Sequence, residues 1–71
     1  MIDLAVYSEI LPDGKSLGGV LESIESVGDG LARISVSGRK RCVPEELPLK
    51  GLVSKRIVVN HLAGRWGCGA V

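Results

Sequence analysis

Residues 26–36 read Ser26-Val27-Gly28-Asp29-Gly30-Leu31-Ala32-Arg33-Ile34-Ser35-Val36, and this run carries the clearest local signal in the chain. The residues after Gly30 alternate between apolar and polar side chains, which is typical of a strand with one buried face. Asp-Gly between two apolar runs favours a tight hairpin, because glycine accepts the positive φ that primed turns require. The run therefore predicts two antiparallel strands joined by a two-residue turn.

The alternation continues in both directions from this hairpin. It predicts five short strands, at residues 2–10, 20–27, 31–37, 39–43 and 55–62. Val20 and Leu21 are adjacent apolar residues, so the second strand is expected to carry a bulge or to be shared between two layers. Residues 11–19 contain a Pro-Asp-Gly turn and a pair of glycines and are expected to form a loop.

A helical turn is expected between the fourth and fifth strands. Pro44-Glu45-Glu46-Leu47 places proline at the first helical position and acids near the positive end of the turn, and Pro48 prevents its continuation. Five strands with one short helical turn before the last strand predict an all-β fold, namely a small five-stranded SH3-like barrel, with an OB-like barrel as the alternative. Residues 1–63 would form this barrel, and residues 64–71 a Gly-rich C-terminal tail.

Charges are sorted along the chain. Residues 1–32 carry six acidic residues against one lysine, a net charge of −5, whereas residues 33–71 carry eight basic residues against two glutamates, a net charge of +6. The sum of +1 hides an acidic half joined to a basic half. Such asymmetry bears on partners and association rather than on the fold.

Size and composition favour association inside a cell. The chain has 71 residues, of which 45% are hydrophobic and none is Phe, and a domain this small buries only about 60% of its unfolded surface. We expect apolar surface to be left for a partner. No run approaches the ~20 apolar residues that cross a bilayer, and no basic start followed by an apolar stretch marks a signal peptide. The prediction is a cytoplasmic protein with no membrane partner.

Few residues could carry catalysis or bind a metal. His61, Cys42 and Cys68 are the only soft ligands, one fewer than the four of a structural zinc site, and a Cys/His nucleophile needs a third group to orient the imidazole. His61 falls on the inward register of the last predicted strand. The cysteine spacing of 26 positions matches no metal or redox motif, so two free thiols are expected, with a single disulfide as the alternative. We predict no catalytic residue, no cofactor, no metal site and no enzymatic role.

The remaining expectation is a subunit or adaptor that forms a homo-oligomer or docks in a larger multi-subunit assembly, such as a virion or a similar particle. Its contacts would combine complementary charged surfaces with an apolar patch. The basic residues expected to bind a partner are Arg39, Lys40, Arg41, Lys55 and Arg56. The apolar residues expected to do so are Leu31, Val58, Leu62 and Trp66. The acidic surface that they would meet on a neighbour comprises Asp13, Glu22 and Glu25.

Nucleic acid is the alternative partner. A basic surface formed by Arg39-Lys40-Arg41 and Lys55-Arg56 would neutralise phosphates and bind with salt-sensitive affinity. Small barrels that bind single strands also use aromatic side chains as stacking platforms. This chain offers only Tyr7 and Trp66, so a protein partner is favoured.

Overall fold

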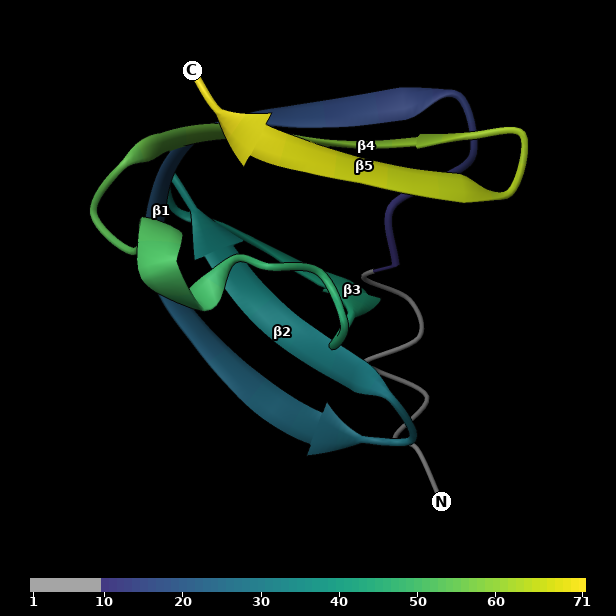
Figure 1. Cartoon of the computed structure of the whole chain (residues 1–71), viewed down its shortest axis with the longest axis horizontal. Coiled ribbons are helices and arrows are strands. Elements are labelled where there is room, and N and C mark those ends of the chain that lie inside the picture. The colour runs from purple at the N-terminus through teal and green to yellow at the C-terminus, as the bar shows by residue number, and fades with distance from the viewer. Residues whose placement is uncertain (1–9) are drawn as a thin grey trace.

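The structure, a computed structural model, describes residues 10–71, which form a five-stranded antiparallel sheet (Figure 1). The elements are β1 (Lys15–Gly28), β2 (Leu31–Val36), β3 (Arg39–Pro44), the 3-10 turn η1 (Lys50–Leu52), β4 (Arg56–Leu62) and β5 (Arg65–Ala70). Neighbouring strands follow the order β3-β2-β1-β4-β5. The predicted all-β class, the five-stranded architecture and one short helical turn are confirmed. The strand predicted at residues 2–10 lies outside the described residues, except for Ile10.

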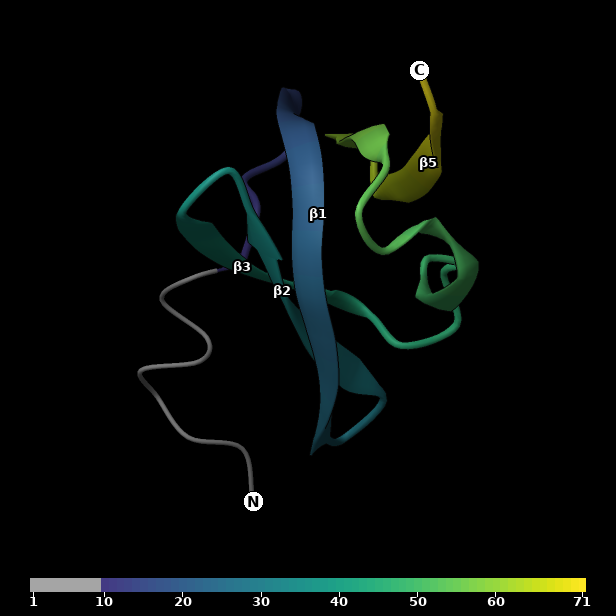
Figure 2. The same ribbon diagram turned by 90° about the vertical axis from the view of Figure 1, so that its left-hand side faces the viewer.

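The long strand β1 belongs to both halves of the sheet. Its residues 15–20 pair with β4, and its residues 21–28 pair with β2. Figure 2 shows β1 between the β2–β3 hairpin on one side and β5 on the other. The predicted sharing of this strand between two layers is confirmed. The strand begins at Lys15, however, so the loop prediction was wrong for residues 15–19.

Gly19 lies where β1 changes partner. Its φ of 150° is one that residues with a side chain rarely adopt. A Cβ at this position would lie 2.3 Å from the Ser37 hydroxyl oxygen, and that oxygen accepts a hydrogen bond from the Val20 N–H at 3.0 Å. The glycine pair that indicated a loop therefore serves a bend inside a strand.

Three two-residue turns with positive φ join strands into hairpins. Asp29-Gly30 (φ 55° and 75°) joins β1 to β2, as predicted, and Ser37-Gly38 (48° and 83°) joins β2 to β3. Ala63-Gly64 (52° and 75°) joins β4 to β5. The segment expected to be a C-terminal tail is instead the last strand, paired with β4 along its whole length.

The helical turn lies further along the chain than predicted. Pro44 is the last residue of β3, and residues 44–47 form a single turn in which Leu47 N donates to the Pro44 carbonyl at 3.2 Å. The helical element η1 follows the fully buried Leu49. Proline is compatible with an edge strand, where its missing N–H is not required, and the acids that follow do not extend a helix here.

The two halves of the sheet enclose one main core. Its buried members are aliphatic and come from four of the strands and two connecting segments: Leu11, Leu17, Leu21, Ile34, Val36, Val43, Leu49, Ile57 and Val59. Pairing stops at β3 and β5, which are not bonded to each other within residues 10–71, so the sheet is bent but not closed into a barrel. No helix in this part of the chain is long and apolar enough to span a membrane.

Candidate interaction surfaces

Two of the acidic residues predicted to face a neighbour have partners within the chain. The Glu22 carboxylate accepts hydrogen bonds from Gly38 N at 2.7 Å and from the Ser35 hydroxyl at 3.0 Å. Asp13 Oδ1 lies 3.8 Å from Nδ1 of His61. Both carboxylates, although exposed, therefore contact turns and strand ends of their own chain.

The third predicted acid, Glu25, lies among bases. It is opposite Arg33 in the register of β1 and β2, and Lys40 of β3 lines the same shallow depression. Neighbouring strands here come from both halves of the sequence, so acidic and basic residues interleave on this face. The charge sorting seen along the chain does not persist on it.

The four apolar residues predicted to contact a partner are spread over three surfaces. Val58 and Leu62 share the outward face of β4, where Leu62 is 67% exposed and Val58 half-buried. Leu31 packs in a small cluster around the buried Cys42. Trp66 is half-buried against the main core. Only Leu62 of the four is strongly exposed.

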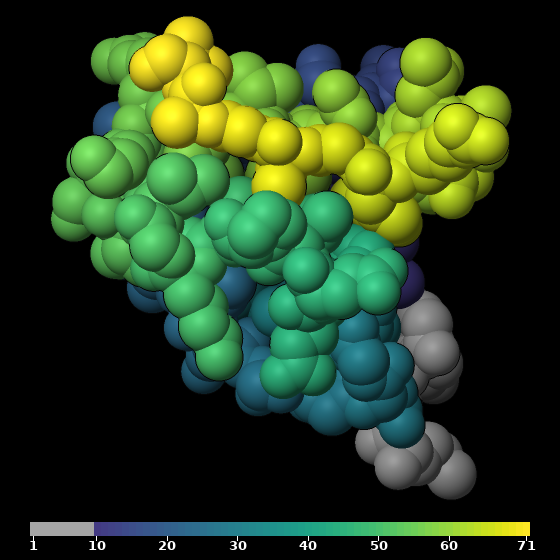
Figure 3. All heavy atoms as spheres, in the orientation of Figure 1, coloured from purple at the N-terminus to yellow at the C-terminus, as the bar shows by residue number. Residues whose placement is uncertain are grey.

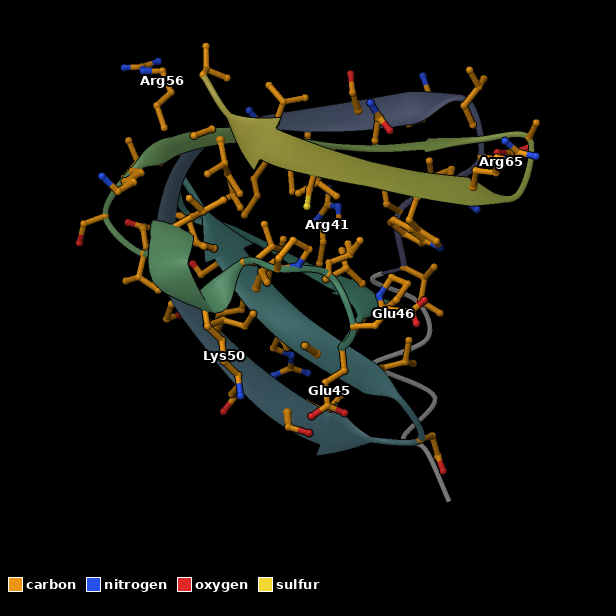
Figure 4. The ribbon with its side chains drawn as sticks, in the orientation of Figure 1. Arg41, Glu45, Glu46, Lys50, Arg56 and Arg65 are labelled. Carbon is orange, nitrogen blue, oxygen red and sulfur yellow. The ribbon has the colours of Figure 1, made fainter. Side chains whose placement is uncertain are left out.

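The predicted basic residues also separate in space. Arg39 and Arg41 share the inward register of β3, and Lys40 lies on its outward face. Lys55 and Arg56 lie at the start of β4, beside the bend of β1. Figure 4 shows Arg56 at the periphery and Arg41 nearer the centre.

A third base joins Arg39 and Arg41. Lys15, at the start of β1, lines with them a pocket of about 230 Å³ whose lining includes the buried Leu11 and Leu17. Among residues 10–71 the lining contains no carboxylate, and the three bases form no ion pair. We call this site the cationic pocket.

Three exposed acids gather elsewhere, and sequence analysis did not select them. Asp29 lies in the turn after β1, and Glu45 and Glu46 follow β3. A hydrogen bond of 2.8 Å from Glu45 N to the Gly30 carbonyl ties the two segments together. No ion pair neutralises these acids within the described part of the chain. We call the three residues the acidic tip; its sequence signal was the adjacent acid pair between two prolines, which was assigned to a helical turn.

The outer edge of β3 is protected. The two-residue turn before β3 makes residues 36 and 39 a hydrogen-bonded pair, so the backbone groups of residues 40, 42 and 44 point away from β2. Arg41 Nη1 donates to the Lys40 carbonyl at 2.7 Å, and Cys42 forms a parallel bridge with Ile10. Pro44 has no N–H to offer. These features hinder the addition of another strand.

Within residues 10–71, the outer edge of β5 has no such protection. Val71 N donates to the Arg56 carbonyl at 2.9 Å, so alternation directs the backbone groups of Trp66, Cys68 and Ala70 away from β4. These groups make no backbone hydrogen bond within residues 10–71. Figure 3 shows β5 in yellow as a band at the surface. The strand contains no proline, and its one charge is at its first residue.

His61, Cys42 and Cys68, the residues considered for catalysis, pack against other side chains of the fold. His61 lies on the inward register, as predicted, and its ring stacks on Trp66 with centroids 4.2 Å apart and planes 11° apart. Cys42 and Cys68 form no disulfide with each other, so the alternative of a single bridge is not seen. No cluster of three His, Cys, Asp or Glu side chains that could hold a metal occurs within residues 10–71.

The chain matches no protein-family model, no curated protein and no solved structure in the three comparisons made.

Proposed function

We propose that the protein is a non-enzymatic β-sheet subunit that assembles with further copies of itself by strand addition at β5. The observation that carries this proposal is the contrast between the two edges, since among the described residues β3 is protected and β5 is not. An exposed row of N–H and C=O groups is a template for pairing with another chain. In such pairing the main-chain hydrogen bonds supply affinity.

A second copy of β5 is the occupant that this edge fits best. Antiparallel pairing about a two-fold axis at Cys68 would place Trp66 of each copy opposite Ala70 of the other, an isologous contact. The two Arg65 side chains would then be about 20 Å apart, six residues at ~3.4 Å each, which exceeds the screening length of about 10 Å at 0.1 M salt. The central residues of the strand are uncharged, so no like charges meet at the axis.

The finer fold supported by this arrangement is a partly open OB-like barrel rather than the SH3-like one. An OB-fold is a five-stranded, partly open barrel, and here a long bent β1 lies between β2 and β4, with η1 between β3 and β4. OB-folds often bind oligonucleotides through strands 2 and 3 and adjoining loops. In this chain Asp29 occupies the β1–β2 turn and neither β2 nor β3 carries an aromatic residue. This favours a protein partner over nucleic acid.

Proline substitutions in β5 test the proposal. The Cys68 N–H points away from β4, so Cys68→Pro removes no hydrogen bond inside the chain but blocks pairing at the centre of the edge. The Gly69 N–H faces β4, so the matched variant Gly69→Pro removes an internal bond. At about 1 M salt, which screens contacts between charged surfaces, we expect light scattering at about 10 to 200 µM to give a dimer for the natural chain and a monomer with near-natural thermal stability for Cys68→Pro. Gly69→Pro should show a clearly lower unfolding midpoint.

Two results would overturn strand addition at β5. One is a natural chain that stays monomeric throughout this concentration range. The other is a folded Cys68→Pro chain that dimerises as the natural chain does. Because Cys68 packs partly on the core, Ala70→Pro serves as the second variant; Ala70 is exposed and its N–H also points outward.

A further inference from the structure

We propose a second contact, in which the acidic tip of one copy docks in the cationic pocket of the next copy. This inference rests on the proposed self-association, but it uses neither β5 nor its edge. The tip comprises Asp29, Glu45 and Glu46, and the pocket is lined by Lys15, Arg39 and Arg41. The contact joins different surfaces of the two copies and is therefore heterologous.

The cationic pocket concentrates positive charge without a counterion among residues 10–71. Lys15 and Arg39 are exposed and Arg41 is half-buried, and no described carboxylate pairs with any of them. The nearby Asp13 is directed to His61, 3.8 Å away, and accepts a hydrogen bond from Gly64 N at 3.4 Å. The neighbouring acid is thus engaged elsewhere, and an anion from outside would supply the missing charge. Arginine suits carboxylates especially, because its fork of donors matches their two oxygens.

The acidic tip has the complementary character and cannot reach the pocket of its own chain. Figure 2 shows β3 and the chain before β1 on one side of the molecule, whereas the segment that follows β3 crosses to the other side. The tip residues are all exposed, and Gly30, Pro44, Glu45 and Glu46 line a shallow hollow of their own. Three acids facing three bases would steer two copies into one register. Docking between copies is the arrangement that brings these surfaces together.

A second copy is a better occupant than a nucleic acid. A phosphate would also satisfy the three bases, but the lining of the pocket contains no aromatic side chain on which a base could stack. The stacking side chain Trp66 is engaged with His61. The tip, in contrast, is present at the same concentration as the pocket in every solution of the protein. Nucleic-acid binding at the pocket is therefore the competing outcome of the test.

Reciprocal charge reversal gives a specific test. Lys15→Glu with Arg39→Glu makes the pocket acidic, and Glu45→Lys with Glu46→Lys makes the tip basic; all four side chains are exposed, so folding is retained. Each double variant alone should lose the contact, with association at low salt at least about tenfold weaker, because like charges then face each other. Mixing the two variants should restore the contact, and sedimentation should then show complexes that contain both variants in equal amounts, because each surface again meets one of opposite charge. The matched control is Lys55→Glu with Arg56→Glu, which reverses two exposed charges outside the pocket and should behave as the natural chain does.

Three outcomes would overturn the inference. The pocket variant could associate as strongly as the natural chain, or the mixture could show no complex beyond those of its components. Alternatively, a single-stranded oligonucleotide could bind the natural chain and lose its affinity in the pocket variant but not in the control. The β5 edge is the same in every solution, so a failure of strand addition would show in the proline variants and not in this comparison.

Discussion

Gly19 is the residue on which the bend of β1 depends. Its φ is 150°, and a Cβ would lie 2.3 Å from Ser37 Oγ and 3.0 Å from a Val36 methyl carbon. Gly19→Ala should therefore combine backbone strain with overpacking and lower the free energy of unfolding by about 2 to 4 kcal/mol. Urea unfolding followed by circular dichroism measures this loss.

Gly69 is the matched control for that substitution. It lies in β5 with no positive φ, and nothing lies within 4 Å of a Cβ placed on it. Gly69→Ala should change the free energy of unfolding by no more than about 0.5 to 1 kcal/mol, because alanine reduces the entropy of the unfolded chain without strain. Equal losses in the two variants would show that the bend tolerates a side chain.

Single residues explain which turns could be predicted. Asp29-Gly30 ends in glycine and begins with an aspartate that tolerates positive φ, so local chemistry alone predicted this turn. Ala63 adopts a φ of 52° without such chemistry, and it does so because β4 and β5 pair on either side of it. Strand pairing overrode local preference there, and the hairpin went unpredicted.

At the scale of elements, the β2–β3 hairpin depends on a side chain from β1. Glu22 accepts hydrogen bonds from Gly38 N and Ser35 Oγ and so fastens the turn between these strands. Glu22→Ala should lower the free energy of unfolding by about 1 kcal/mol, a value reduced by the exposure of the group. Glu25→Ala is the control, since the Glu25 side chain lies on the same strand and is also exposed; its effect should be within about 0.5 kcal/mol. Thermal or urea unfolding of both variants distinguishes a structural Glu22 from one reserved for a partner.

The arrangement of the strands explains why the candidate surfaces were hard to predict from the sequence. Alternation identified β2 and β4, because the inward faces of these two strands are mostly aliphatic. The strand β5 has two glycines among six residues, so neither periodicity nor propensity marked it, and its open edge could not be anticipated. Sequence analysis selected Asp13, Glu22 and Glu25 because they lie in the acidic half of the chain. Whether such a carboxylate can bind a partner depends on its hydrogen bonds within the fold, such as those of Glu22. Strand pairing across the two halves decided which charges remain free.

For the whole molecule, the two proposed contacts differ in symmetry. Pairing at β5 is isologous and stops at two copies, whereas the contact of tip and pocket is heterologous and continues from copy to copy. Together they would build assemblies larger than a dimer. The chain measures 33 × 25 × 21 Å, and the tip and pocket lie on different sides of it, so each copy could receive one neighbour while it engages another.

The salt concentration should affect these two contacts differently. Electrostatic attraction between exposed groups extends over roughly 20 to 30 Å at about 0.01 to 0.02 M salt but only about 3 Å at 1 M, whereas main-chain pairing is much less sensitive. Sedimentation of the natural chain should therefore show species larger than a dimer at low salt and dimers at high salt. Cys68→Pro should form head-to-tail oligomers at low salt and monomers at high salt, because it retains only the charged contact. Dissociation of the natural chain to monomers by salt alone would contradict pairing at β5, since hydrogen bonds between strands would then not hold the dimer.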